Sequence, residues 1–259
     1  DFKNTIRDIP SMQTAYSLAL ARAGYYKKAN VLIDELNPSY RFSANIALAR
    51  IMAKANKFNQ ANESFTKAKL NMRRNIYFDD SEGNDYTKLI EALSETGFHE
   101  RASKIICKAK NTWLKNMLFC VQAKAQAKAG FFKESRRTIK KMNRLEDYPD
   151  TYKYEAVYCL GEALCKAGLR AKAAEILDDP DSTYFGQLHA PIYLAKAQYS
   201  AGMFDEAGKT FKRTREKFTK PLLSYSKNEL LGRLIEAMVE TGFYKEAASY
   251  IKESDLAIV

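Results

Sequence analysis

Few side chains in this sequence could carry out chemistry. A structural zinc site needs cysteines or histidines in closely spaced pairs such as CxxC, and no such pair occurs. Glycine-rich phosphate loops and the HExxH and GxSxG motifs are absent as well. We therefore expect no catalytic residue, no metal ion, no cofactor and no enzymatic activity. The reactive residue types are His99, His189, Cys107, Cys120, Cys159 and Cys165.

We expect structural roles, not chemical ones, for these histidines and cysteines. We expect the two histidines at helix starts, exposed or capping, and the four cysteines as reduced fillers among apolar neighbours. An acidic stretch from Asp79 to Asp85 has the composition of a calcium loop, but Asn84 or Asp85 stands where such a loop needs glycine. We expect instead a solvated loop that ends in an N-cap for a helix beginning at Tyr86.

The composition is that of a folded, globular chain. It has 259 residues, of which 46% are hydrophobic and 28% are charged. No apolar run reaches the roughly 18 residues that a membrane span needs, and the first residues lack the layout of a signal peptide. We expect a cytoplasmic protein without a membrane span and, because the sequence starts at Asp1 instead of Met, a piece of a longer protein.

One sequence pattern recurs seven times along the chain. Each copy has a segment rich in small residues, then a turn residue, then a charged segment with a small residue five positions after the turn. Glycine supplies the positive φ that ends a helix, and asparagine is the next best residue there. The seven turn residues are Gly24, Asn56, Gly97, Gly130, Gly168, Gly202 and Gly242.

Each copy predicts an antiparallel helical hairpin. Apolar residues flank the turns at the spacing of amphipathic helices, as in Leu89, Ile90 and Leu93. The small residue would allow the two helices to cross closely, and the aromatic after the turn residue would fill the angle between them. The intervals between successive turns are 32, 41, 33, 38, 34 and 40 residues, alternating between short and long. A pair of hairpins therefore repeats at a more regular interval than a single hairpin does. We expect an all-α, right-handed solenoid of about seven hairpins, forming one domain over residues 1–259.

The recurring sequence pattern resembles the tetratricopeptide repeat and, more weakly, the pentatricopeptide repeat. With the turn residue as position fifteen of the tetratricopeptide motif, Ala29 and its equivalents fall on the small position twenty. The large apolar position twenty-four holds Ile33, Phe65 and, in the last copy, Ile251. The resemblance extends from about Ser11 to Ser254.

The resemblance implies that the first helix of each hairpin lines a concave groove for a peptide or protein. Positions nine and thirteen would face this groove, and at position nine the charge alternates in sign from Arg50 to Glu236. The alternation indicates either ion pairs between neighbouring hairpins, such as Arg50 with Glu91, or recognition of a peptide carrying both charge signs. The candidate groove residues, with three tyrosines as aromatic anchors, are Arg50, Lys54, Glu91, Glu95, Lys124, Lys128, Tyr158, Glu162, Tyr193, Lys196 and Tyr199.

Positive charge is concentrated in the middle of the chain. Between Arg101 and Arg144 there are 13 Lys or Arg residues and one acid, Glu134, whereas the whole chain has a net charge of +11. Such a band is either a set of solvated helix faces or a surface for an anionic partner such as an acidic protein segment, nucleic acid or phospholipid. The candidate basic patch consists of Arg101, Lys104, Lys108, Lys110, Arg136, Arg137, Lys140 and Lys141.

Three functions fit these patterns. The first is a non-enzymatic scaffold that binds a protein or peptide partner, acidic or mixed in charge, because a groove is expected and a reaction centre is not. The second is binding of RNA or another polyanion through the basic band, although Thr87 and Gly232 do not keep the base-reading residues of pentatricopeptide proteins. The third is a regulatory or accessory domain of a larger protein.

Overall fold

The protein is all-helical throughout the residues that the structure describes, which confirms the all-α prediction. The structure is a computed structural model, and its described residues form 14 helices and no strand. The helices group into two compact units, Asp1–Lys110 and Asn111–Val259, called here the first and the second unit. The described residues are 10–72, 83–109, 111–142, 151–177, 184–218 and 224–255.

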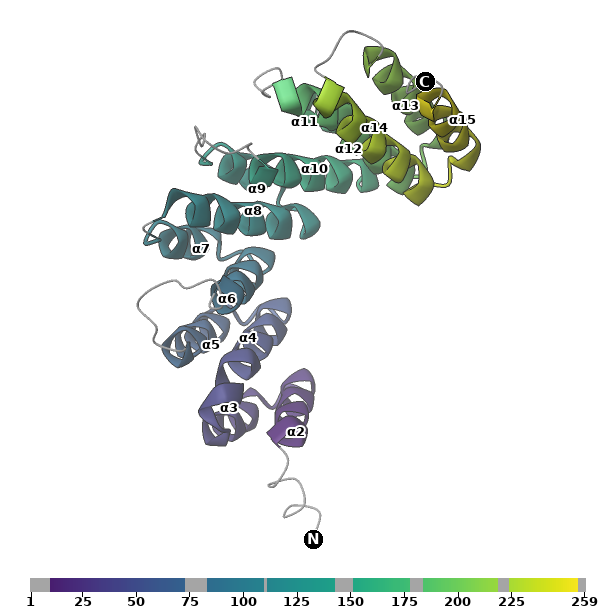
Figure 1. Ribbon diagram of the computed structural model, residues 1–259. Helices are drawn as coiled ribbons and strands as arrows, with labels where there is room; N and C mark the ends of the chain where they lie inside the picture. The colour runs from purple at the N-terminus through teal and green to yellow at the C-terminus, as the bar shows by residue number, and fades with distance from the viewer. Residues whose placement is uncertain are drawn as a thin grey trace. The chain divides into compact units, whose positions relative to one another are not determined.

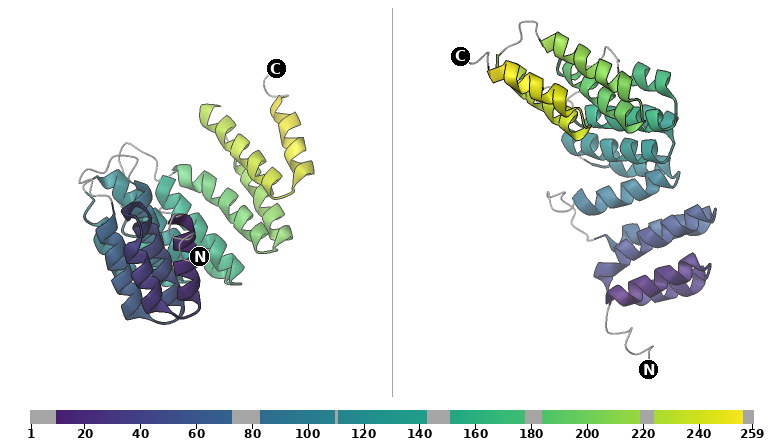
Figure 2. Two further views of the ribbon diagram at one scale, coloured as in Figure 1. Left: turned by 90° about the horizontal axis from the view of Figure 1, so that it is seen from below. Right: turned by 90° about the vertical axis from the view of Figure 1, so that its right-hand side faces the viewer.

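The described helices come in seven pairs, each joined by a three-residue connection (Figures 1 and 2). The two helices of a pair pack against each other in antiparallel directions. The first helices of the pairs are α2 (Pro10–Arg22), α4 (Pro38–Lys54), α6 (Gly83–Glu95), α8 (Thr112–Lys128), α10 (Thr151–Lys166), α12 (Tyr184–Ser200) and α14 (Ser224–Glu240). The second helices are α3 (Tyr26–Glu35), α5 (Phe58–Asn71), α7 (His99–Ile106), α9 (Phe132–Ile139), α11 (Arg170–Leu177), α13 (Phe204–Phe218) and α15 (Tyr244–Asp255).

Within each unit, every pair packs on the next pair along the chain. In the first unit α2 contacts α4, and α4 contacts α6. In the second unit α8 contacts α10, α10 contacts α12, and α12 contacts α14. The side chains of successive first helices therefore lie next to each other within a unit.

Every connection closes its first helix with the same two backbone hydrogen bonds. At the fourth connection the amide of Phe131 donates to the carbonyl of Gln126 (2.8 Å). The amide of Gly130 donates to the carbonyl of Ala127 (3.1 Å), which completes a Schellman motif. This motif needs a left-handed residue, and φ is 59° at Asn56 and between 75° and 89° at the six turn glycines. The seven predicted turn residues are confirmed.

Replacing Gly130 by Ala should destabilise the fold, whereas replacing Gly232 by Ala should stabilise it. A Cβ atom would meet nothing within 4 Å at either glycine, so the backbone conformation decides the sign. Gly130 has φ +85°, a left-handed conformation that costs an L-residue about 1–2 kcal/mol. Gly232 lies inside α14, where Ala is better than Gly by about 0.5–1 kcal/mol. Urea unfolding followed by far-UV circular dichroism measures both changes, and two changes of equal sign would refute this assignment.

Two first helices begin with asparagine caps. The Oδ1 of Asn37 accepts a hydrogen bond from the amide of Ser39 (3.2 Å), and the intervening residue is proline, which suits a first helical position. The Oδ1 of Asn111 accepts a hydrogen bond from the amide of Trp113 in the same way (2.8 Å). Each cap satisfies an amide that has no partner within its helix.

Two expected helix starts were wrong. The helix predicted to begin at Tyr86 begins at Gly83, so Asp85 is a first-turn acid of α6 and not its N-cap. A carboxylate in that turn still interacts favourably with the positive end of the helix dipole. His189 lies inside α12, which starts at Tyr184 and continues through a proline, whereas His99 does begin α7.

The small residues five positions after the turn residues are buried in every pair. Each is 0–2% exposed, as expected for residues at a close helix crossing. The one polar member of the series, Ser135, donates from its hydroxyl to the carbonyl of Ala123 on α8 (2.8 Å), so it is satisfied in the core. The series consists of Ala29, Ala61, Ala102, Ser135, Ala173, Ala207 and Ala247.

At Phe98 and Phe243 the aromatic after the turn contacts the preceding pair, whereas the prediction placed this ring between the two helices of its own pair. The ring of Phe98 lies 5.4 Å from that of Phe65, and the ring of Phe243 lies 5.4 Å from that of Phe211. Each ring therefore fills the space between its own pair and the second helix of the preceding pair. Tyr25 belongs to the first described pair, before which the structure describes no other pair, and it is 56% exposed.

The large apolar position after the turn is also buried wherever the structure describes its side chain, with one exception. Ile33, Phe65 and Phe211 are fully buried, whereas Ile251 is 45% exposed. Ile251 lies on α15, which packs chiefly on α14 and is followed by no further described helix. No described helix therefore covers the side on which a following pair would pack.

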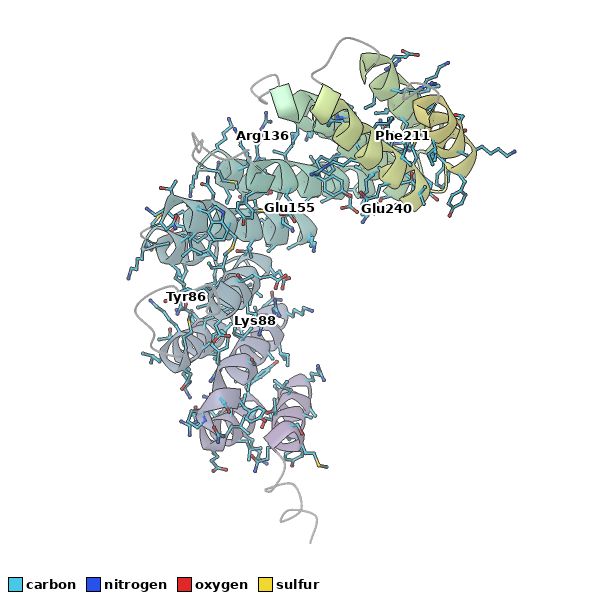
Figure 3. All side chains as sticks on the ribbon, in the orientation of Figure 1. Tyr86, Lys88, Arg136, Glu155, Phe211 and Glu240 are labelled. Carbon is cyan, nitrogen blue, oxygen red and sulfur yellow. The ribbon has the colours of Figure 1, made fainter. Side chains whose placement is uncertain are left out.

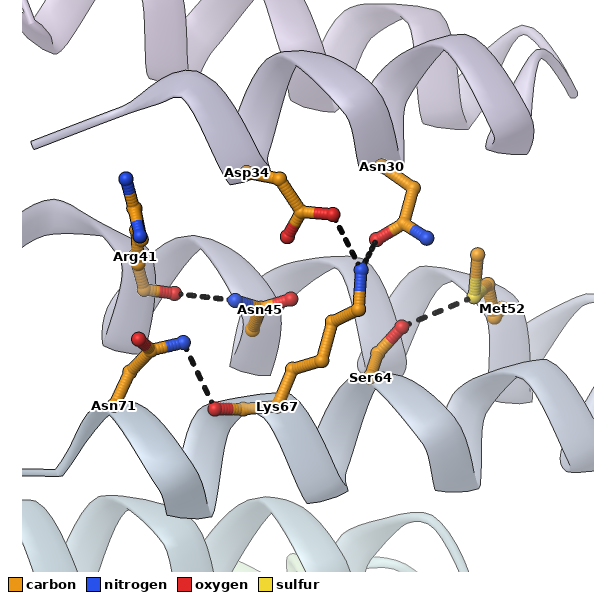
Figure 4. Close-up of polar contacts among 8 residues, drawn as sticks. All are labelled: Asn30, Asp34, Arg41, Asn45, Met52, Ser64, Lys67 and Asn71. Atoms are coloured by element: carbon orange, nitrogen blue, oxygen red, sulfur yellow. Dashed lines mark hydrogen bonds and ion pairs between the residues drawn. The ribbon is translucent and has the colours of Figure 1, made fainter. Parts of the chain in front are cut away.

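Polar side chains link successive second helices in the first unit (Figure 4). The ammonium of Lys67 on α5 donates to Asn30 Oδ1 (3.0 Å) and pairs with Asp34 Oδ2 (2.5 Å), both on α3. The guanidinium of Arg101 on α7 donates to the backbone carbonyl and the side chain of Asn62 on α5. Burial lowers the pKa of Arg101. These two cations therefore hold second helices together.

Candidate functional site

In the first unit, the candidate groove residues of α4 and α6 are joined by ion pairs. The guanidinium of Arg50 lies 2.9 Å from Glu95 Oε2 and 3.7 Å from Glu91 Oε2. The predicted pair of Arg50 with Glu91 is therefore confirmed, and Glu95 is a second partner. The three side chains are 35–43% exposed, so each pair is worth about 0–1 kcal/mol and mainly fixes how α4 lies against α6.

A hollow of about 500 Å³ lies beside Arg50, at the C-terminal ends of α2 and α4. Among the described residues, Arg22 and Lys54 have no ion-pair partner, and the buried Nε of Arg50 has no hydrogen-bond acceptor. The hollow is therefore lined by positive charge that no described carboxylate neutralises at Arg22 and Lys54. Its polar lining consists of Arg22, Tyr26, Arg50 and Lys54.

In the second unit, Lys124 on α8 pairs with Glu155 on α10, which Figure 3 labels. The Nζ atom of Lys124 lies 2.5 Å from Glu155 Oε1, and the thiol of Cys120 donates to Oε2 of the same carboxylate (3.6 Å). Burial lowers the pKa of Lys124, but the hydrogen bond and charge of Glu155 outweigh it and leave the pKa raised. Burial and the charge of Glu155 raise the pKa of Cys120. The lysine is charged and the thiol protonated at neutral pH.

Two further ion pairs occupy the first helices of the second unit. Glu162 pairs with Lys166 one turn later on α10 (2.5 Å). Lys196 on α12 pairs with Glu240 on α14 (2.5 Å), and Figure 3 labels Glu240 near the end of α14. Most of the candidate groove charges are thus neutralised within the fold.

The pairing predicted from equivalent positions was wrong in the second unit. Lys124 reaches Glu155 instead of Glu162, which is seven residues later, and Lys196 reaches Glu240 instead of Glu236, which is four residues earlier. Residues separated by four or seven positions lie on one helix face, one or two turns apart. The repeat pattern identifies that face, whereas the stagger of neighbouring helices selects the turn.

Of the three candidate tyrosines, Tyr158 and Tyr193 form a ring pair between α10 and α12. Their centroids lie 4.8 Å apart and their planes are tilted by 33°. Burial and the charge of Glu162 raise the pKa of Tyr158. Tyr199 packs instead on Phe204 at the connection after α12, with centroids 5.0 Å apart. Tyr158 and Tyr193 therefore lie near the charged residues of the first helices, whereas Tyr199 contributes to packing at a connection.

A hollow of about 720 Å³ lies at the C-terminal ends of α8 and α10. Lys128 and Glu162 line it together with Lys166, and Phe132 adds aromatic surface. Because Glu162 pairs with Lys166, Lys128 is left without an ion-pair partner among the described residues. Burial raises the pKa of Cys159, which also lines the hollow, so this thiol is a poor nucleophile.

The candidate basic patch is divided between the two units. Arg101 is engaged with α5, as described above. Lys104 and Lys108 are exposed in the first unit. Lys110 lies outside the described residues. The part of the patch in the first unit is therefore small.

In the second unit, the residues of the candidate basic patch lie on α9 or directly after it. Arg136, Arg137, Lys140 and Lys141 are all exposed. Arg136 pairs with Glu175 on α11 (3.0 Å). This cluster therefore keeps most of its charge facing solvent.

Within the described ranges, no group of three or more His, Cys, Asp or Glu residues could hold a metal ion. The four cysteines are unpaired; Cys107 is exposed, whereas Cys120 and Cys165 are buried. No described helix has both the length and the apolar character needed to cross a membrane.

The candidate groove residues leave out Arg22, Tyr26, Glu155, Lys166 and Glu240, which belong to these sites. Arg22, Lys166 and Glu240 occupy position thirteen, which the repeat pattern directs to the groove. Glu155 and Tyr26 occupy neither groove position. The packing of α8 on α10 and of α3 on α4 brings these two residues to the sites.

Comparison with known proteins identifies no family. No family model matches the chain. No curated protein matches it either. The function proposed below therefore rests on the side chains and their geometry.

Proposed function

We propose that the chain is a tetratricopeptide-like, right-handed solenoid of helical hairpins that acts as a non-enzymatic scaffold. Its ligand would be an acidic peptide or protein segment bound along the first helices. Two observations support the solenoid: successive pairs pack through their first helices within each unit, and every connection repeats one closing motif. A row of stacked hairpins presents an extended surface, which suits a peptide better than a small substrate.

The single observation that carries the proposal is an imbalance of charge beside the two hollows. Lys54 and Lys128 have no ion-pair partner among the described residues. The acids near them are engaged by other cations, Glu91 and Glu95 by Arg50 and Glu162 by Lys166. An incoming ligand therefore meets positive charge at each hollow, which favours acidic partners.

The lining of the hollows indicates the ligand's chemistry. In the first unit a ligand carboxylate could accept from the exposed ammonium of Lys54, which is a charge-assisted donor. Ile51 in the first hollow and Phe132 in the second offer apolar surface beside the lysines. Such a lining suits a segment in which acidic and apolar residues alternate.

Neutralising one cation in each hollow should weaken peptide binding. The probes are fluorescein-labelled 12-residue peptides that alternate Glu with Leu or Phe, and matched peptides with Lys for Glu. For the double variant Lys54→Gln with Lys128→Gln, we expect affinity for the acidic peptides to fall about tenfold, or about 1.4 kcal/mol. Both lysines are exposed, so thermal stability should change little.

The control is the double variant Lys27→Gln with Lys245→Gln. It removes the same charge, one lysine from each unit, at exposed positions on second helices. Fluorescence anisotropy should show less than a twofold loss for it, roughly the effect of net charge alone. Equal losses for both variants, equal affinity for basic peptides, or no binding of any peptide would each rule out the proposed site.

A further inference from the structure

The solvent face of α9 carries an unusual run of cations. Lys133, Arg136 and Arg137 lie on the helix, and Lys140 and Lys141 lie in the turn that closes it. All five are exposed. Their spacing of three and four residues places them on one side, opposite the buried Ser135, Thr138 and Ile139. These five cations are called here the α9 stripe.

Equivalent positions on other second helices do not form such a stripe. On α13 they hold Asp205, Gly208, Lys209, Lys212 and Arg213, and on α3 they hold Lys27, Asn30, Val31, Asp34 and Glu35. The fold therefore does not require cations at these positions. Favourable interaction with the helix C-terminus explains cations in the last turn, but not Lys133 in the first turn, where the helix dipole disfavours positive charge.

Most cations of the α9 stripe are left without an ion pair within the described part of the chain, unlike Lys67 and Arg101 of the first unit. In the first unit Lys67 and Arg101 are engaged by neighbouring helices. In the stripe, Arg136 pairs with Glu175 on α11. Among the described residues, Lys133, Arg137 and Lys140 have no ion-pair partner.

We propose that the α9 stripe binds the phosphodiester backbone of nucleic acid by charge alone, without reading bases. Cations four residues apart lie about 6 Å apart along the helix, comparable to the spacing of successive phosphates on a single strand. The exposed Arg170 and Lys172 extend the charge onto α11, which the pair of Arg136 with Glu175 links to α9. This site is separate from the first-helix hollows and does not depend on the function proposed for them.

Nucleic acid fits this surface better than the other anionic partners. No large apolar side chain is exposed among the described residues of α9, so the apolar anchor of a membrane-binding helix is missing there. None of the five cations lines either of the two hollows described above, so neither hollow gives a protein partner an anchor pocket within the stripe. A phosphate backbone needs neither, because released counterions drive its binding.

The test compares two triple variants of the full chain for binding to fluorescein-labelled 12-nucleotide oligouridine. The α9 variant is Lys133→Gln, Arg137→Gln and Lys140→Gln, which spares the paired Arg136. The matched control is Lys209→Gln, Lys212→Gln and Arg213→Gln, which removes the same charge from exposed positions of α13 in the same unit. Far-UV circular dichroism melts verify that both variants fold.

We expect the α9 variant to lose about tenfold in affinity at low salt and the α13 control to lose less than about threefold. The slope of log K against log salt should be about −3.5 for the natural chain and about −1.5 for the α9 variant, because each phosphate contact contributes about −0.7. Oligothymidine should bind like oligouridine.

Three results would overturn the proposal. The first is equal loss of affinity in the two triple variants, or no loss in either. The second is tighter binding of a 12-residue polyglutamate than of oligouridine, which would make the stripe a protein-binding surface. The third is stronger association with phosphatidylserine vesicles at equal anion concentration, which would make it a lipid-binding surface.

Discussion

Truncation of Phe211 to Ala is expected to lower the free energy of unfolding by about 3–5 kcal/mol. Phe211 is fully buried in a cluster that includes Ile192 and Leu234, and Figure 3 labels it among the helices of the last two pairs. Its ring also meets that of Phe243 edge-on, at 5.4 Å. Removing it leaves a cavity that α13, held by neighbours on both sides, cannot close fully.

The matched control is Phe204→Ala. Phe204 lies on the same helix but is 55% exposed, so we expect a loss below about 1 kcal/mol. Trp113, the sole tryptophan of the sequence, lies in the second unit, so its fluorescence during urea unfolding follows that unit. Similar losses for the two variants would show that the core is not centred on Phe211.

Cys107 should react with iodoacetamide at pH 8 at least about 100-fold faster than Cys120 in the native protein. The thiolate is the reacting species, and a raised pKa keeps a thiol protonated. Burial, followed by the charge of Glu155, raises the pKa of Cys120, and the residue is 2% exposed. Cys107 is exposed at the end of α7.

A short pulse of iodoacetamide, followed by peptide mass spectrometry, measures both rates in one unmodified sample. The same pulse in guanidinium chloride serves as the control, where all four cysteines should be modified at similar rates. Rapid native labelling of Cys120 would mean that α8 and α10 separate readily, and the contact with Glu155 would then be only transient.

The connections could be predicted from the sequence because their chemistry is local. A left-handed residue that ends a helix is almost always Gly or Asn, so Gly130 and Asn56 identify their own conformation. The burial of Ala29 and its equivalents could be predicted as well, since it follows from the fixed distance to the turn. Tyr25 and Ile251 differ because their burial depends on helices of another pair.

The ion pairs between successive first helices could be predicted only in part. The repeat pattern identified the residues that share the first-helix face, and the pair of Arg50 with Glu91 followed from it. It could not select Glu155 over Glu162 as the partner of Lys124, because both carboxylates lie on the same face of α10. That choice depends on the core packing of α8 on α10, which no single residue encodes.

The backbone hydrogen bonds of each connection fix how the second helix of a pair is rotated relative to the first helix. The amide of Phe131 closes α8, and its carbonyl accepts from the amide of Ser135 in the first turn of α9 (2.9 Å). One inserted residue would rotate the second helix by about 100° and turn Ser135 away from its crossing point. Spacing between turns nevertheless varies from 32 to 41 residues, while every connection keeps three. Affinity tags or foreign epitopes are therefore best grafted between pairs, where natural length variation is already accommodated.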